Sequence, residues 1–227
     1  MPSSRALIAA LSLAAAGAYG ADLSREEAEA LFEAPSAARV NEGVLVFLSS
    51  LPEKPVHHHQ NHIVITEASL RDGWVTLDQC HAELDAVDRS QIVFSRDRTR
   101  ELGVTAAEGI GEVWVEGNTV QLRDTARGAR LCIHARSRAL APADDGSFVL
   151  KNGPYLRRFL DGYYPMRVSM RVTLDGPRLQ LAATTPPSQP GFSIWSEGNE
   201  VFFDAQFEGR LTTELRFTRP PEYPQHR

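Results

Sequence analysis

Histidine is concentrated in one segment, VHHHQNHIVI at residues 56–65, which holds four of the seven histidines of the chain. Neutral imidazole is a nitrogen ligand that suits zinc and copper, and its charge changes near neutral pH. The segment therefore predicts a Zn²⁺ or Cu²⁺ site or a proton-responsive site. The plainer alternative is a polar surface run, following Pro55, that has no function.

The next apolar run, WVTLDQCH at 74–81, determines which histidines can meet. If the two runs form a hairpin with Ile63 facing Leu77, the same register brings His59 opposite His81, with β-carbons about 5 Å apart. A slip of one residue would move every side chain to the other face. That register places Asn61 and Gln79 on the face of His59, and the candidate metal ligands are His57, His59 and His81 on that face and His62 with Asp78 on the other.

Two cysteines, Cys80 and Cys132, lie in strand-like segments. An even number of cysteines in an exported chain predicts a disulfide bond. The alternative is that both thiolates bind a metal, because His81 and His134 stand close to them in sequence.

The first residues carry the marks of a secretory signal peptide. Arg5 precedes an apolar run of about a dozen residues, and small residues follow before Ala21. We expect residues 1–20 to be removed and the mature protein to be periplasmic or secreted, although a buried N-terminal helix would also fit. Residues 21–40 are predicted to form a helical segment, which Pro35 limits. No later run is long enough for a transmembrane anchor.

Residues 41–218 predict an all-β domain, an antiparallel sandwich or a barrel-like fold, because short alternating strands recur between Gly, Asp and Pro turns. One short helical insertion is expected near 154–161, with a subdivision of the domain near 153. Residues 219–227 read as a flexible tail.

A second cluster near the insertion combines aromatic and guanidinium groups, which suits an anion or a sugar. Ordinary packing at a sheet edge is the alternative. The residues of this cluster are Tyr155, Arg157, Arg158 and Tyr163.

The net charge of −5 argues against a nucleic-acid partner. No nucleophile elbow, HExxH motif, P-loop or dinucleotide fingerprint is present, so no strong motif supports an enzyme. The sequence favours a noncatalytic binding or envelope-assembly protein, with an unidentified envelope protein as a partner. A metal-dependent or His/Asp hydrolase is the alternative, and no cofactor other than zinc or copper is implied.

Overall fold

The computed structural model describes residues 41–50 and 53–220, so the predictions for residues 1–20, 21–40 and most of the tail lie outside it. Strands dominate, with one turn of α-helix, α2 (Ser69–Asp72), and one 3-10 turn, η1 (Arg96–Arg98). The strands are β1 (Val46–Phe47), β2 (His58–Thr66), β3 (Trp74–Leu84), β4 (Val87–Val93), β5 (Thr99–Glu116), β6 (Thr119–Arg138), β7 (Leu140–Pro142), β8 (Phe148–Tyr155), β9 (Arg158–Phe159), β10 (Gly162–Tyr163), β11 (Met166–Asp175), β12 (Gln180–Thr185), β13 (Phe192–Glu197), β14 (Glu200–Glu208) and β15 (Leu211–Thr218).

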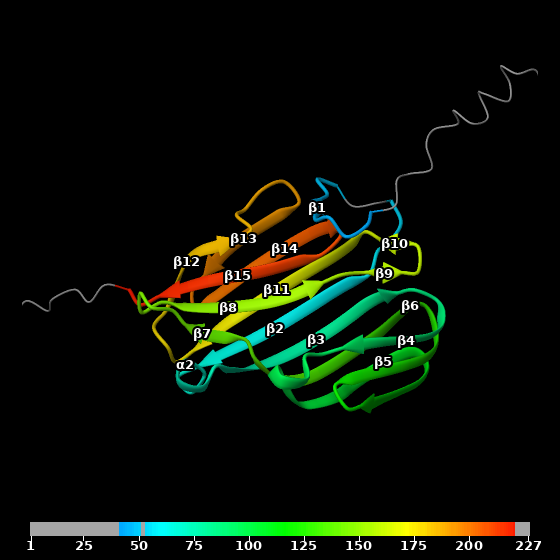
Figure 1. Cartoon of the computed structure of the whole chain (residues 1–227), viewed down its shortest axis with the longest axis horizontal. Coiled ribbons are helices and arrows are strands. Elements are labelled where there is room, and N and C mark those ends of the chain that lie inside the picture. Colours follow the sequence, from blue (N-terminus) through cyan, green and yellow to red (C-terminus); the bar gives the residue numbers. More distant parts are fainter. Residues whose placement is uncertain (1–40, 51–52, 221–227) are drawn as a thin grey trace, which may run out of the picture. The chain divides into compact units, whose positions relative to one another are not determined.

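The strands form two principal sheets (Figure 1). The larger sheet has the order β1-β14-β11-β2-β3-β6-β4, with β13 added on β14 and β5 on β6, and the smaller has the order β12-β15-β8-β7. All strand pairs are antiparallel except β2 with β11, which run parallel. The predicted all-β fold is confirmed, in its sandwich form, because the sheets do not close into a barrel.

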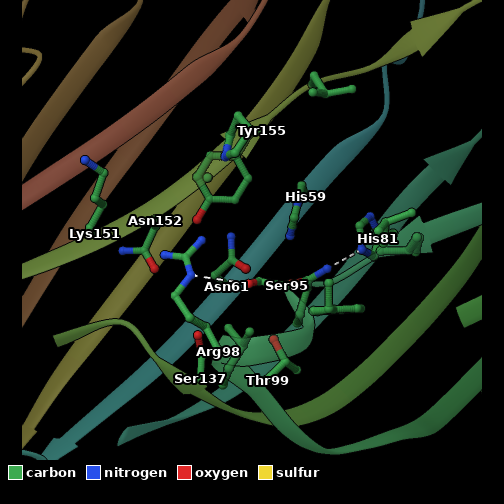
Figure 2. A pocket seen from close by; sticks show the side chains of 18 of the residues that line it. His59, Asn61, His81, Ser95, Arg98, Thr99, Ser137, Lys151, Asn152 and Tyr155 are labelled. Carbon is green, nitrogen blue, oxygen red and sulfur yellow. Dashed lines mark hydrogen bonds between the residues drawn. The ribbon is translucent and has the colours of Figure 1, made fainter. Parts of the chain in front are cut away.

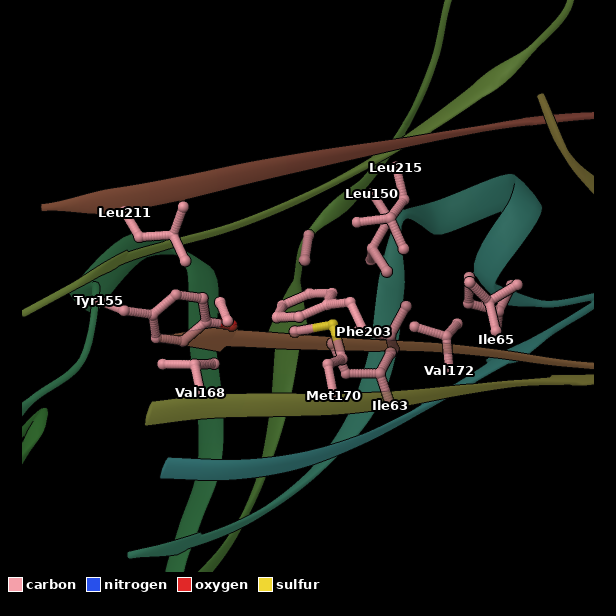
Figure 3. Packing of buried hydrophobic residues seen from close by; sticks show 14 of the residues in the cluster. Ile63, Ile65, Leu150, Tyr155, Val168, Met170, Val172, Phe203, Leu211 and Leu215 are labelled. Atoms are coloured by element: carbon pink, nitrogen blue, oxygen red, sulfur yellow. The ribbon is translucent and has the colours of Figure 1, made fainter. Parts of the chain in front are cut away.

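The main core lies between the two sheets (Figure 3). Leu150 on β8 and Leu215 on β15 point from the smaller sheet toward Ile63, Met170 and Phe203 of the larger one. These side chains are almost fully buried, and their burial supplies the main driving force for joining the layers. The core therefore joins strands from both sides of residue 153, which itself lies inside β8.

Strands β5 and β6 form a long hairpin around Gly117 and Asn118. Gly117 has a φ of +60°, which suits the tight turn. Strand β6 is long enough to pair with β3 along its C-terminal half and with β4 along its N-terminal part. A second apolar cluster fills this region and consists of Val120, Leu122, Leu131 and Ile133.

The predicted helical insertion at 154–161 is wrong. Strand β8 continues to Tyr155, and β9 and β10 form a small antiparallel hairpin instead. Arg157 donates hydrogen bonds to both carboxylate oxygens of Asp85, at 2.9 and 2.6 Å, and one to the Pro165 carbonyl at 3.0 Å. Strand pairing and these long-range contacts keep the segment extended, although Pro154 and Gly162 would suit the two ends of a short helix.

Candidate functional site

The register predicted for the histidine hairpin is confirmed. Strands β2 and β3 pair with Ile63 opposite Leu77 and His59 opposite His81. Since side chains alternate along a strand, the face carrying His59 is the face that turns toward the core.

Polar side chains interrupt this inner face. Along β2 and β3 its apolar rows give way to two cross-strand pairs whose four members are all at most 8% exposed. The neighbouring strands remain apolar at the same level, with Val168 and Met170 on β11 and Leu131 and Ile133 on β6. We call this group the inner polar patch; it consists of His59, Asn61, Gln79 and His81.

His57 reaches the inner polar patch from the residues that lead into β2. Its Nε2 lies 2.8 Å from His81 Nδ1, and Gln79 Nε2 lies 2.6 Å from His81 Nε2. If the Gln79 amide donates, His81 carries its proton on Nδ1 and donates it to His57. The His59 ring packs 4.3 Å from that of His81, measured between centroids. The three imidazoles thus converge as the register predicts.

Burial keeps these imidazoles neutral. Desolvation, followed by the Arg157 charge, lowers the pKa of His57 to about 4. Desolvation also lowers the pKa of His59 to about 3, an effect that the nearby Gln79 and Asn61 amides offset only in part, and it lowers the pKa of His81 well below its usual value. At neutral pH each ring therefore keeps an unprotonated nitrogen.

The inner polar patch forms one wall of a cleft of about 590 Å³ (Figure 2). Strand β8 contributes Asn152 and Tyr155 to its lining, and the segment around η1 contributes Ser95 and Arg98. This volume lies within the range of small-molecule sites, roughly 300–1,000 Å³. We call this space the inter-sheet cleft.

Two polar atoms of the inner polar patch have no hydrogen-bond partner among the residues that the structure describes. They are His59 Nε2 and Asn61 Nδ2, and both are buried. A buried polar atom left unpaired costs about 1–3 kcal/mol. Both residues line the cleft, and a ligand could bond these two atoms after a shift of the side chains that shield them from water.

The predicted disulfide is confirmed, since Cys80 and Cys132 are bonded to each other. They stand directly opposite on β3 and β6, with Cα atoms 4.1 Å apart. Because Cys80 lies between Gln79 and His81 in sequence, the bond fixes β3 against β6 beside the inner polar patch. Both sulfurs are used in this bond, so neither is a thiolate metal ligand.

His62 and Asp78 face each other across the ladder but have other partners on the outer face. His62 bonds Thr173 Oγ1 at 3.0 Å and Arg171 at 3.2 Å. Asp78 accepts a hydrogen bond from His134 Nδ1 at 2.7 Å. The alternation of β2 separates this pair from the three inward imidazoles.

No three His, Cys, Asp or Glu side chains within residues 41–50 and 53–220 are placed to hold one metal ion. The rings of His57 and His81 are hydrogen-bonded to each other through nitrogens 2.8 Å apart. Two nitrogen ligands of a tetrahedral zinc ion would lie roughly 3.3 Å apart. Binding of zinc or copper remains a prediction, as does a hydrolase reaction. In the described chain, Asp85 is engaged by Arg157 rather than by an imidazole.

Only one member of the predicted anion or sugar cluster lines the inter-sheet cleft. Tyr155 does so, with its ring edge-on to His59 at 5.0 Å. Arg157 is held by Asp85. Arg158 stacks on the Tyr163 ring, and Tyr163 accepts hydrogen bonds from Arg210 through its hydroxyl.

The sequence did not single out Asn61 and Gln79 as site residues, although the predicted register placed both on the inner face. The available signal was that both residues are polar, although they occupy positions where the alternation of the two strands predicts apolar, inward-facing residues. Arg98 and Asn152 carry no such signal, because only the packing of η1 and β8 brings them to the cleft.

No family model, no curated protein and no solved structure matches this chain. Among the helices of the described residues, none has the length and apolar character needed to cross a membrane.

Proposed function

We propose that this chain is an exported, noncatalytic binding protein that holds a small organic molecule in the inter-sheet cleft. The observation that carries this proposal is a pair of buried atoms, His59 Nε2 and Asn61 Nδ2, which have no hydrogen-bond partner in the described part of the chain and belong to residues that line the cleft. Folding alone gives no reason to keep them, because an apolar residue of similar shape would avoid the cost of desolvation. A ligand that bonds them would recover that cost.

Two features support a periplasmic site of action. The disulfide Cys80–Cys132 fits an oxidising compartment, and the N-terminal sequence has the pattern of a signal peptide. Recruitment of an envelope protein remains a further, separate prediction.

The test is native mass spectrometry of untagged protein purified from the periplasm. We expect a bound organic molecule that is released on denaturation. The Asn61→Leu variant should carry less of it, whereas His134→Asn, altered on the outer face, should carry as much as the wild type. The proposal fails if the native protein carries no ligand and no compound of a metabolite library raises its melting temperature.

Metal binding is a second candidate, favoured by the convergence of three neutral imidazoles. A Zn²⁺ or Cu²⁺ ion could replace the His57–His81 hydrogen bond if the rings rotate apart. Metal analysis of the same preparation tests this candidate. Stoichiometric metal in the wild type that is lost in His81→Gln but kept in His134→Asn would support it, and metal-free protein with no measurable zinc affinity would reject it.

A further inference from the structure

We infer that the ligand of the inter-sheet cleft is an amphiphilic organic anion, whose anionic group Arg98 binds and whose apolar body lies against β4. This inference rests on the proposed function and names the chemical class of the ligand.

The charge of the cleft lining is the first step. No Asp or Glu of the described residues lines the cleft, and the cations that do are Arg98 and Lys151. Lys151 is paired with Glu214 at 2.7 Å, and its amino group points away from the centre in Figure 2. The net positive charge of the cleft lining therefore comes from Arg98, which is also exposed to solvent.

Arg98 has little to neutralise it. Within the described part of the chain its one hydrogen bond through a side-chain nitrogen is a long one, from Nε to Ser95 Oγ at 3.4 Å, and no carboxylate forms an ion pair with it. In Figure 2 its guanidinium group points toward Asn61 and Tyr155, which line the same cleft. Guanidinium presents planar, paired donors that match a carboxylate or sulfonate.

Neighbouring groups add neutral donors. The unpartnered Asn61 Nδ2 can donate to the same anion. Burial raises the pKa of the Tyr155 hydroxyl above its usual value, so the hydroxyl keeps its proton and can donate as well. A donor-rich site with a free guanidinium favours an anion over a neutral polar molecule.

Apolar side chains also line the cleft. They are Ile92 on β4, Phe94 directly after it, Leu77 on β3 and Leu156 directly after β8. Leu156 is 38% exposed, so an apolar ligand body would remove its side chain from water. The cleft thus offers both a guanidinium group and apolar side chains.

The experiment uses two fluorescent probes that differ by one charged group, anilinonaphthalene sulfonate and the uncharged phenylnaphthylamine. We expect the sulfonate to bind one site at least about tenfold more tightly, because a charge-assisted hydrogen bond contributes that much. Arg98→Gln should remove this preference and leave the affinity for phenylnaphthylamine within about twofold. Arg96→Gln, on the same turn but outside the cleft lining, should change neither affinity.

The outcomes separate the two proposals. Equal affinities for both probes, or an unchanged sulfonate affinity in Arg98→Gln, would overturn the anion inference while the cleft still binds ligands. If neither probe binds, that result would count against the proposed function itself. If Asn61→Leu binds the sulfonate as tightly as the wild type, the probe lies outside the inter-sheet cleft, and this result would also overturn the inference.

Discussion

Asn61 belongs to the inner polar patch, which interrupts an otherwise apolar sheet face. Its parallel neighbour on β11 is Met170, and its cross-strand partner on β3 is Gln79. The amide nitrogen of Asn61 is buried without a partner, so the folded protein is less stable than it would be with an apolar residue at this position. Such a cost is typical of positions kept for binding.

Replacing Asn61 with leucine should separate stability from binding. We expect Asn61→Leu to raise the free energy of unfolding by about 1 kcal/mol, because the variant removes a buried, unpaired donor and keeps the branched shape of the side chain. The same variant should lose the ligand of the inter-sheet cleft. Urea denaturation and native mass spectrometry provide the two measurements.

Thr213 on β15 supplies the matched control. Its Oγ1 is also buried and unpartnered, but the residue does not line the cleft. Thr213→Val should therefore stabilise the protein and leave ligand binding intact. Loss of binding in both variants, or in neither, would contradict a specific role for Asn61.

Among the elements, strand register was predicted best where two paired strands are close in sequence and apolar and polar residues alternate along both. Ile63 and Leu77 fixed the β2–β3 register, and that register correctly placed His59 opposite His81. The helix predicted near 154–161 was wrong because Pro154 and Gly162 also suit the ends of a helix, whereas the Arg157–Asp85 contact depends on residues far apart in the chain. The parallel pairing of β2 with β11 also has no local signal.

The Cys80–Cys132 bond should stabilise the larger sheet substantially. It closes a loop of 52 residues, for which the chain-entropy model gives about 4 kcal/mol. We expect the double variant Cys80→Ala/Cys132→Ala to lose that amount in urea denaturation. Reductant should weaken the wild type to a similar level and should not affect the double variant. Rapid alkylation of the native, unreduced protein would show instead that the bond is absent.

At the scale of the whole molecule, packing of the smaller sheet over the larger one turns a polar patch into a cleft. The sequence predicted the strands of both sheets but could not predict which strands lie opposite the histidines. Strand β8 brings Tyr155 to His59, although nearly a hundred residues separate them. The interface between the two sheets depends on the packing of many side chains, so the position of Arg98 beside the inner polar patch could not be predicted from the sequence either.

The same burial should make the stability of the molecule depend on pH. His57 and His59 have pKa values of about 4 and about 3 in the folded protein, and that of His81 is also well below its usual value. In the unfolded chain each should titrate near 6.5. Between these values the unfolded chain takes up protons that the folded protein does not, so the folded state is fully stabilised above pH 6.5 and weakens as the pH falls toward about 4.

The expected loss is up to about 1.4 kcal/mol per pH unit for each of these histidines. Urea denaturation at pH 8, 7, 6 and 5 should show constant stability down to about pH 7 and a steep decrease below it. The double variant His57→Gln/His59→Gln should have a shallower decrease, because two groups that resist protonation are gone while the fold and the disulfide remain. A wild type that is equally stable at pH 8 and pH 5, or a double variant with an unchanged slope, would show that the imidazoles reach water and titrate normally. The inner polar patch would then be an open, hydrated surface, and its two unpartnered atoms would no longer favour a ligand.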